Sequence, residues 1–193
     1  LALETGPDRF DLKRLFIEDP DSRAELSLRK TGDAVAFAYQ GRLTKATVDR
    51  FVRDNTLLGG RIMGGMRGRI DLAVPGQSSA EGRLEIAQLA LPWPEGPSLT
   101  IEEASLYGET HRLDVERLTV LVDGEPFAAA GEAVGAADGI RLNATVRAER
   151  IDLNRWQEIL TRKPKDAKKA RPAAALPVTG TVQVAADTVL YDT

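Results

Sequence analysis

One apolar spacing recurs along the chain, as in Leu84, Ile86, Leu89 and Leu91: two apolar residues with one residue between them, then two intervening residues, and then a second such pair. On a helix these four side chains would point at roughly 0°, 200°, 140° and 340°, so they cannot share one face. Each pair alone alternates with period two, as in a half-buried strand. The spacing therefore predicts strands. It also occurs at Phe10, Leu12, Leu15, Ile17; Leu99, Ile101, Ala104, Leu106; Leu113, Val115, Leu118, Val120; Val146, Ala148, Ile151, Leu153; and Val184, Ala186, Val189, Tyr191.

The middle step of this spacing reverses the phase of the alternation. A strand keeps its apolar side chains on one face across such a step only if it carries an extra residue there, at a β-bulge or a sharp bend. Bends that line up from strand to strand fold a sheet along that line. The residues therefore predict an all-β fold with one or two short helices: an elongated, bent antiparallel sheet over residues 1–193 that forms a trough with an apolar inside.

The composition narrows the classes of function. Lys and Arg number 26 and Asp and Glu 29 in 193 residues, a net charge of −3, which gives no field that would attract nucleic acid. Cysteine is absent and His111 is the single histidine, so we expect no metal site and no cofactor, and His111 is predicted to be an ordinary surface residue. Aromatic residues make up 5%, which favours a shallow or unfilled interior.

The sequence offers no convincing catalytic constellation. Glu85, Asp114 and Glu116 fall on the alternate, solvent-facing positions of their strands, where solvated charge is the expected role rather than a hydrolytic pair. The glycine-rich run 59–68 follows a predicted helix and opens a strand, which is the reverse of the order in a phosphate-binding loop. We therefore expect a protein that is not an enzyme.

The predicted elements follow from local patterns. A spacing of three and four around Val48 predicts a helix over residues 44–58, with Thr44 or Thr47 as its N-cap and Gly59-Gly60 at its end. Strands are expected near 10–17, 24–30, 35–39, 61–74, 84–91, 99–106, 113–120, 127–134, 140–153 and 179–191, with hairpin turns at Asp123-Gly124 and Asp138-Gly139.

Two segments are candidates for contacts outside the sheet. The sequence Leu91-Pro92-Trp93-Pro94 puts an indole on a stiff loop, where the ring either caps one end of the sheet or contacts a membrane or partner. A short helix begins near Asn154 and is expected to pack Trp156 onto the sheet. Residues 163–177 are rich in Lys, Ala and Pro and are predicted to form a loop or linker, whose cations either remain solvated or attract anionic lipid head groups; they include Lys163, Lys165, Lys168 and Lys169.

Several segments together resemble the AsmA-like family, which is related to TamB and YhdP within the group of repeating β-groove, bridge-like lipid transfer proteins. The resemblance rests on Gly68-Arg69-Ile70-Asp71-Leu72, on Gly82-Arg83-Leu84-Glu85-Ile86, on the segment 148–156, and on Thr179-Gly180-Thr181-Val182 after the Pro- and Ala-rich spacer. It is best over residues 60–193. These motifs are apolar spacings rather than catalytic letters.

The resemblance implies a periplasmic protein of a diderm bacterium that acts in phospholipid transport or outer-membrane biogenesis. Its anchor in the inner membrane would lie in a segment outside this sequence, and the start at Leu1 without a methionine leads us to expect a piece of a longer chain. The expected partners are phospholipid acyl chains, neighbouring β-repeats and a membrane surface. An acyl chain in an aliphatic trough gains about 0.8 kcal/mol of binding free energy for each CH₂ group that is buried, without any specific polar contact. The residues expected to line it are Ile70, Leu72, Leu84, Ile86, Leu99, Ile101, Leu113, Val115, Val146, Ile151, Val182 and Val184.

Two other functions remain open from the sequence. The chain can be an interaction module whose exposed sheet edges pair with neighbouring repeats or with strands of outer-membrane proteins during their assembly. It can also be a carbohydrate-active or other hydrolytic β-domain, which would need a polar cleft with aromatic platforms and paired carboxylates. The sequence shows no such cluster.

Overall fold

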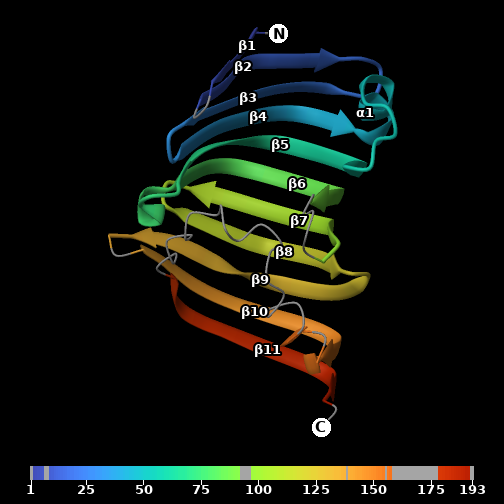
Figure 1. The fold of residues 1–193 in the computed structure, drawn as a ribbon, viewed down its shortest axis with the longest axis vertical. Coiled ribbons are helices and arrows are strands. Elements are labelled where there is room, and N and C mark those ends of the chain that lie inside the picture. The colour runs from blue at the N-terminus through green and yellow to red at the C-terminus, as the bar shows by residue number, and fades with distance from the viewer. Residues whose placement is uncertain are drawn as a thin grey trace.

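The protein folds into a single open β-sheet of eleven strands that lie side by side in chain order, from β1 to β11 (Figure 1). The computed structural model describes residues 2–6, 9–91, 97–137, 139–154, 156–157 and 178–191. The expectation of an all-β fold is confirmed. The strands are β1 (Ala2–Gly6), β2 (Arg9–Glu18), β3 (Arg23–Thr31), β4 (Ala34–Thr44), β5 (Leu58–Asp71), β6 (Ser79–Leu91), β7 (Leu99–Glu109), β8 (Arg112–Val122), β9 (Glu125–Ala136), β10 (Gly139–Asp152) and β11 (Val178–Leu190).

The expectation of a purely antiparallel sheet is wrong at one edge. Every neighbouring pair from β1 to β10 is antiparallel, but β11 runs parallel to β10. A parallel pair needs a connection of a dozen residues or more, because the chain must return to the end of the sheet from which it started. Residues 153–177 between the two strands supply that length. The sheet is therefore mixed.

The bends predicted from the apolar spacing appear as register shifts. Strand β2 carries an extra residue between Leu12 and Leu15, and β8 carries one between Val115 and Leu118. In β7 the pairing with β8 shifts just after Ile101. These are the predicted middle steps, so an extra residue keeps the apolar side chains on one face.

The remaining strands with this spacing behave differently. The shift beside β6 is made by an extra residue of β5, between Leu58 and Arg61, and Gln88 of β6 has a φ of 53°. The parallel strands β10 and β11 keep one constant register from Ile140 to Asp152. The register shifts therefore lie in the antiparallel part of the sheet.

The helix α1 (Lys45–Phe51) is shorter than the predicted range 44–58. Its C-cap is Val52, and Gly59 and Gly60 belong to β5. The side chain of Asn55 accepts hydrogen bonds from the backbone N–H groups of Leu57 and Leu58 and donates to the Leu58 carbonyl oxygen. An Asn side chain that bonds to nearby backbone competes with helical hydrogen bonds, so the chain turns into β5 here.

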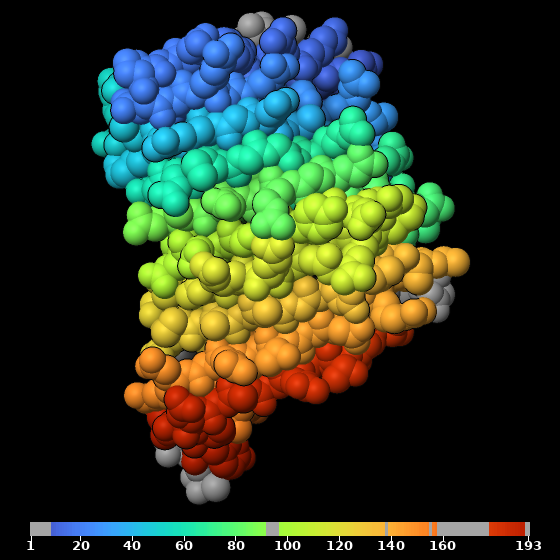
Figure 2. All heavy atoms as spheres, turned by 180° about the vertical axis from the view of Figure 1, so that it is seen from behind, coloured from blue at the N-terminus to red at the C-terminus, as the bar shows by residue number. Residues whose placement is uncertain are grey.

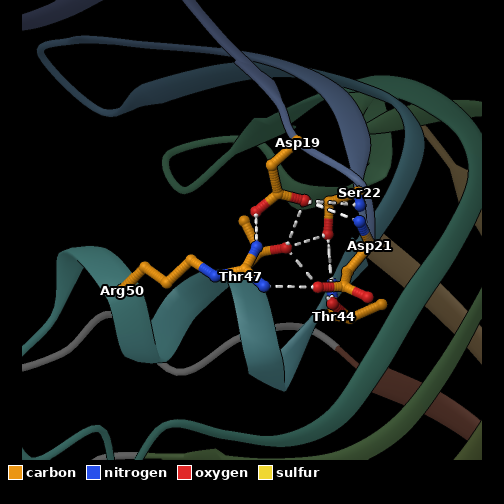
Figure 3. A network of polar contacts seen from close by, with 6 residues as sticks. All are labelled: Asp19, Asp21, Ser22, Thr44, Thr47 and Arg50. Atoms are coloured by element: carbon orange, nitrogen blue, oxygen red, sulfur yellow. Dashed lines mark hydrogen bonds and ion pairs between the residues drawn. The ribbon is translucent and has the colours of Figure 1, made fainter.

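The N-terminus of α1 is held by a polar network on the turn between β2 and β3 (Figure 3). Thr47 is completely buried; its hydroxyl donates to Asp19 Oδ1 at 2.9 Å and lies 2.5 Å from the Ser22 hydroxyl. Thr44 also contacts this pair, and its hydroxyl does not cap the helix. Thr44 is therefore the N-cap residue, one of the two predicted alternatives, but its hydroxyl contacts the Ser22 and Thr47 hydroxyls instead of a backbone N–H of the helix.

Asp19 is the acceptor at the centre of this network. Burial would raise the pKa of its carboxyl, but hydrogen bonds from the hydroxyl of Thr47, the backbone N–H groups of Asp21 and Ser22, and the guanidinium of Arg50 together hold the pKa below its ordinary value. Arg50 also bonds Asp21 at 2.6 Å. Each donor comes from the turn or from α1, so the charged carboxylate ties the helix to the sheet.

The apolar core of the described residues is small. The buried apolar side chains are Ala24, Leu58, Met66, Ile86, Ala104 and Ala148, and three of these six are alanines. Seen from behind, the strands form successive bands in chain order, and no other described segment lies over that face (Figure 2). All eleven described strands belong to one sheet. A sheet covered by a second layer would bury most of its large aliphatic residues on one face. The described part of this sheet is a single layer.

Candidate functional site

One face of the sheet carries continuous rows of apolar side chains that cross the strands. Residues that stand directly opposite each other on neighbouring strands point to the same face. From β6 to β11 one such row contains Ile86, Ala104, Leu118, Ala129, Val146 and Val184. The next row contains Leu84, Leu106, Val115, Gly131, Ala144 and Val182.

The structure brings most of the predicted lining residues onto this face. Six of them lie in the two rows above. Leu99 and Ile101 lie in rows beyond the bend, opposite Val122 and Val120. Leu113 stands opposite Ala133, and Ile70 opposite Val35.

Two predicted lining residues lie elsewhere. Leu72 follows the end of β5 and is 52% exposed. Ile151 is half-buried near the end of β10, opposite Val189.

One border of this face is covered by the connection between β5 and β6. We call Pro75–Ser78 the strap; it contains the 3₁₀ turn η1 (Pro75–Gln77). Pro75 and Gly76 are buried, and a Cβ on Gly76 would lie only 1.8 Å from the carbonyl oxygen of Ala136 at the end of β9. The strap therefore passes the ends of β7 and β8 and packs against β9 and β10 (Figure 1).

Hydrogen bonds hold the strap in place. The Ser78 hydroxyl accepts from the backbone N–H of Asp71 at 3.0 Å, and the Ser78 carbonyl oxygen lies 2.9 Å from Nδ1 of His111. A carbonyl oxygen only accepts, so Nδ1 of His111 carries the proton. The backbone oxygen of His111 accepts in turn from Gly135. His111 is exposed, as expected, and it also links the strap to the β7–β8 turn.

Beneath the strap lies a cavity of about 320 Å³. Strands β4 to β10 all contribute to its wall, and three of the predicted lining residues, Ile70, Leu84 and Leu113, are among them. Its other large apolar residues are Phe37, Met66, Leu106 and Ile140.

The opposite border is marked by a ring contact. Trp156 packs edge-on against Phe127 of β9, with 5.6 Å between the ring centroids. Phe127 is paired with Ala148, just as Ala129 is paired with Val146. The two pairs lie two positions apart along their strands, so Phe127 shares the face of the apolar rows. The prediction that Trp156 packs onto the sheet is confirmed.

The other face of the sheet is polar. Arg83 makes two hydrogen bonds to Glu116, at 2.7 and 3.0 Å, and its guanidinium lies 5.7 Å from the ring centroid of Tyr107. Arg117 bonds Glu103 at 2.6 Å. A larger hollow of about 650 Å³ on this face is lined by residues of both charges: the arginines Arg42, Arg61 and Arg117 and the glutamates Glu85, Glu102 and Glu103. The mixture of signs gives no preference for an anionic or a cationic ligand.

Among the described residues, no three His, Cys, Asp or Glu side chains cluster as metal ligands. The described helices include none long and apolar enough to cross a bilayer. Two of the predicted contact segments lie outside the described residues. They are Trp93 and the predicted linker 163–177, with Lys163, Lys165, Lys168 and Lys169.

Sequence reasoning did not find the strap. Pro75-Gly76 reads as an ordinary turn after a strand, and nothing local shows that this turn packs against β9 and β10. Comparisons with protein-family models, with curated proteins and with solved structures find no match to this chain.

Proposed function

We propose that this chain binds the acyl chains of phospholipids on its apolar face, as a non-enzymatic module of an AsmA-like envelope protein. The module would lie in the periplasm, be anchored to the inner membrane by another part of the protein, and contribute to phospholipid transport or outer-membrane biogenesis. The observation that carries the proposal is a wide apolar face that no second layer of described residues covers.

Physical chemistry supports a lipid rather than a polar ligand. The cross-strand rows consist of aliphatic residues and glycine, and at their β11 end Val182 and Val184 are 50% and 61% exposed. Exposed apolar surface on a protein marks a site for another apolar body. Each buried CH₂ group contributes about 0.8 kcal/mol, so an acyl chain is held without specific polar contacts. The open sheet leaves the ends of the rows accessible, which suits entry and exit of a chain.

The test uses the purified chain and two matched variants on β10. Val146 lies in an apolar row, and its neighbour Thr145 is on the opposite face and exposed. We expect native mass spectrometry to detect co-purified or added phospholipid on the parent chain. Val146→Glu should weaken binding of a fluorescent phospholipid by about tenfold or more, because the acyl chain would have to cover a charge. Thr145→Glu should leave it unchanged. Absence of bound lipid on the parent chain, or equal loss in both variants, would contradict the proposal.

Strand β11 favours a second candidate, an edge that pairs with a strand of another protein. It is one of the two outermost strands, thirteen residues long, with Asp187 as its single charged residue and no proline. Natural sheet edges are usually protected by charge, proline or bulges. This candidate predicts concentration-dependent self-association in sedimentation experiments that persists in Val146→Glu and is lost when Gln183 and Ala185 are both replaced by lysine.

A further inference from the structure

The hollow of about 650 Å³ on the polar face lies at the phase reversals that keep the other face apolar. In β6 both Ile86 and Leu89 belong to apolar rows, and in β7 both Ile101 and Ala104 do. Two residues therefore stand between the rows on each strand. Both of them line the hollow, Ala87 and Gln88 on β6 and Glu102 and Glu103 on β7. The bend thus doubles the number of residues that the outer face presents at this point.

Gln88 takes up the backbone distortion of this bend. Among the described residues other than glycine, it is the only one inside a strand with a positive φ, 53°. Backbone strain of this kind clusters at binding and catalytic sites. Its exposed side-chain amide both donates and accepts hydrogen bonds, so it offers the hollow a group that matches a peptide bond.

The hollow also contains charges that no neighbour compensates. Arg117 is bonded to Glu103 at 2.6 Å, so these two charges compensate each other. Four other exposed residues of the hollow form no ion pair with any described residue: Arg42, Arg61, Glu85 and Glu102. Two guanidinium groups from β4 and β5 and two carboxylates from β6 and β7 therefore remain available to a ligand.

The register explains why these charges do not pair with each other. Arg42 stands opposite Met63, which in turn stands opposite Glu85, so two strand spacings separate the opposite charges. Strand β6 likewise separates Arg61 on β5 from Glu102 on β7. Neighbouring strands lie about 4.8 Å apart, so the backbones that carry opposite charges are about 10 Å apart. A ligand that satisfies both signs must carry a negative and a positive group at about this distance.

We propose that this hollow binds a short zwitterionic peptide, with its terminal carboxylate at Arg42 and Arg61 and its terminal ammonium at Glu85 and Glu102. An extended peptide spans at most about 3.3–3.6 Å per residue, so three residues match the distance. Gln88 lies on the strand between Arg61 and Glu102 and pairs with the peptide backbone. A free amino acid, whose two charged groups share one carbon atom, does not reach both ends.

The first experiment titrates the isotopically labelled whole chain with alanine peptides and follows its backbone amide resonances. Tri-alanine should bind about fivefold more tightly than alanine. It should exceed by the same factor acetyl-tri-alanine, which lacks the ammonium, and tri-alanine amide, which lacks the carboxylate. The shifted resonances should belong to the strands that line the hollow. Equal affinity for the blocked peptides, or no saturable shift at these strands, would overturn the proposal.

Two variants of exposed residues assign the ends of the peptide. Arg61→Gln should weaken tri-alanine binding about fivefold and leave tri-alanine amide unchanged, because that peptide has no carboxylate to pair. Glu102→Gln should weaken tri-alanine equally and leave acetyl-tri-alanine unchanged. The matched controls are Arg147→Gln and Glu149→Gln on β10, both exposed and outside the hollow, which should bind like the parent chain.

The reverse pattern of losses, or no loss in either variant, would overturn the assignment of the hollow. The apolar rows lie on the opposite face of the sheet, so this inference does not depend on lipid binding. A parent chain that binds phospholipid but no peptide would overturn the peptide site alone. Peptide binding without lipid would support it and contradict only the proposed function.

Discussion

The central strands and the last strand carry the same apolar rows and bury them to very different extents. In one row Ile86 of β6 is 9% exposed, whereas Val184 of β11 is 61% exposed. In the next row Leu84 is half-buried and Val182 is 50% exposed. A strand lies on each side of β6, while β11 is flanked by β10 alone. Among the described residues, burial in this sheet is therefore supplied by lateral neighbours and by segments folded over the borders.

This difference predicts two kinds of stability in one sheet. The centre has curvature, the strap and the Phe127–Trp156 contact to exclude water from its side chains. The edge has a parallel pairing to β10 and little apolar burial. Elements with few buried apolar contacts open at low free-energy cost, independently of the rest of the fold. We expect β11 to separate from the sheet before the central strands unfold.

The largest expected effect comes from glycines that permit close strand approach. A Cβ on Gly64 of β5 would lie 2.3 Å from the Arg83 carbonyl oxygen, and φ there is 121°. Gly64→Ala should destabilise the whole fold by roughly 2–6 kcal/mol, the sum of backbone strain and overpacking. In β11 a Cβ on Gly180 would lie 1.8 Å from the Leu142 carbonyl oxygen at a φ of 132°. Gly180→Ala should only release β11, because β11 is an edge strand of the described sheet.

Chemical denaturation and hydrogen exchange distinguish these two responses. Gly64→Ala should lower the midpoint of global unfolding, whereas Gly180→Ala should raise exchange in β11 and leave β4 to β8 protected. The control is Gly32→Ala in the β3–β4 turn, where a Cβ meets no atom within 4 Å and only the φ of 56° is unfavourable. A global loss in Gly180→Ala as large as that in Gly64→Ala would break the comparison.

A smaller effect is expected from removing side chains of one row. Ile86→Ala should cost about 2–4 kcal/mol of unfolding free energy, since it leaves a cavity at a buried position. Val184→Ala should cost less than about 0.5 kcal/mol, because an exposed side chain loses little on truncation. Urea unfolding of both variants measures the difference. Equal costs would mean that β11 is covered by something the row geometry does not include.

The positions of the bulges could be predicted from the sequence because the signal for each lies in a few neighbouring residues. The step from Leu12 to Leu15, and that from Val115 to Leu118, violates strand alternation, and the only remedy that keeps one face apolar is an extra residue. The face of each lining residue follows from the same alternation. Most of these residues therefore share one face of the sheet, as the alternation predicts.

Features that depend on distant segments were not predictable. Gly76 is required by the Ala136 carbonyl oxygen, sixty residues away in the chain, and no local pattern records that approach. The parallel direction of β11 depends on how residues 153–177 return, which composition does not specify. The short helix ends early because Asn55 bonds to the backbone of the next strand, although its position also continues a helical spacing.

A titrating side chain in a flanked position gives an effect that is confined to alkaline pH. Tyr39 of β4 stands opposite Leu26 and Met66, and its hydroxyl donates to the Ile62 carbonyl oxygen at 2.9 Å. Burial raises the pKa of Tyr39 from 10.0 to about 12. The folded state therefore prefers the neutral phenol, so the stability that Tyr39 contributes is complete below pH 10 and is lost as the pH rises from 10 to about 12.

Urea unfolding across that range should show stability falling with pH in the parent chain and falling less steeply in Tyr39→Phe. An equal slope in the variant would assign the alkaline loss to other groups and contradict the prediction. Among the described residues, those beside Tyr39 in the sheet are Leu26 and Met66, on the strands that flank β4. The size of the Tyr39 contribution therefore measures how strongly the folded surroundings exclude water from its phenol.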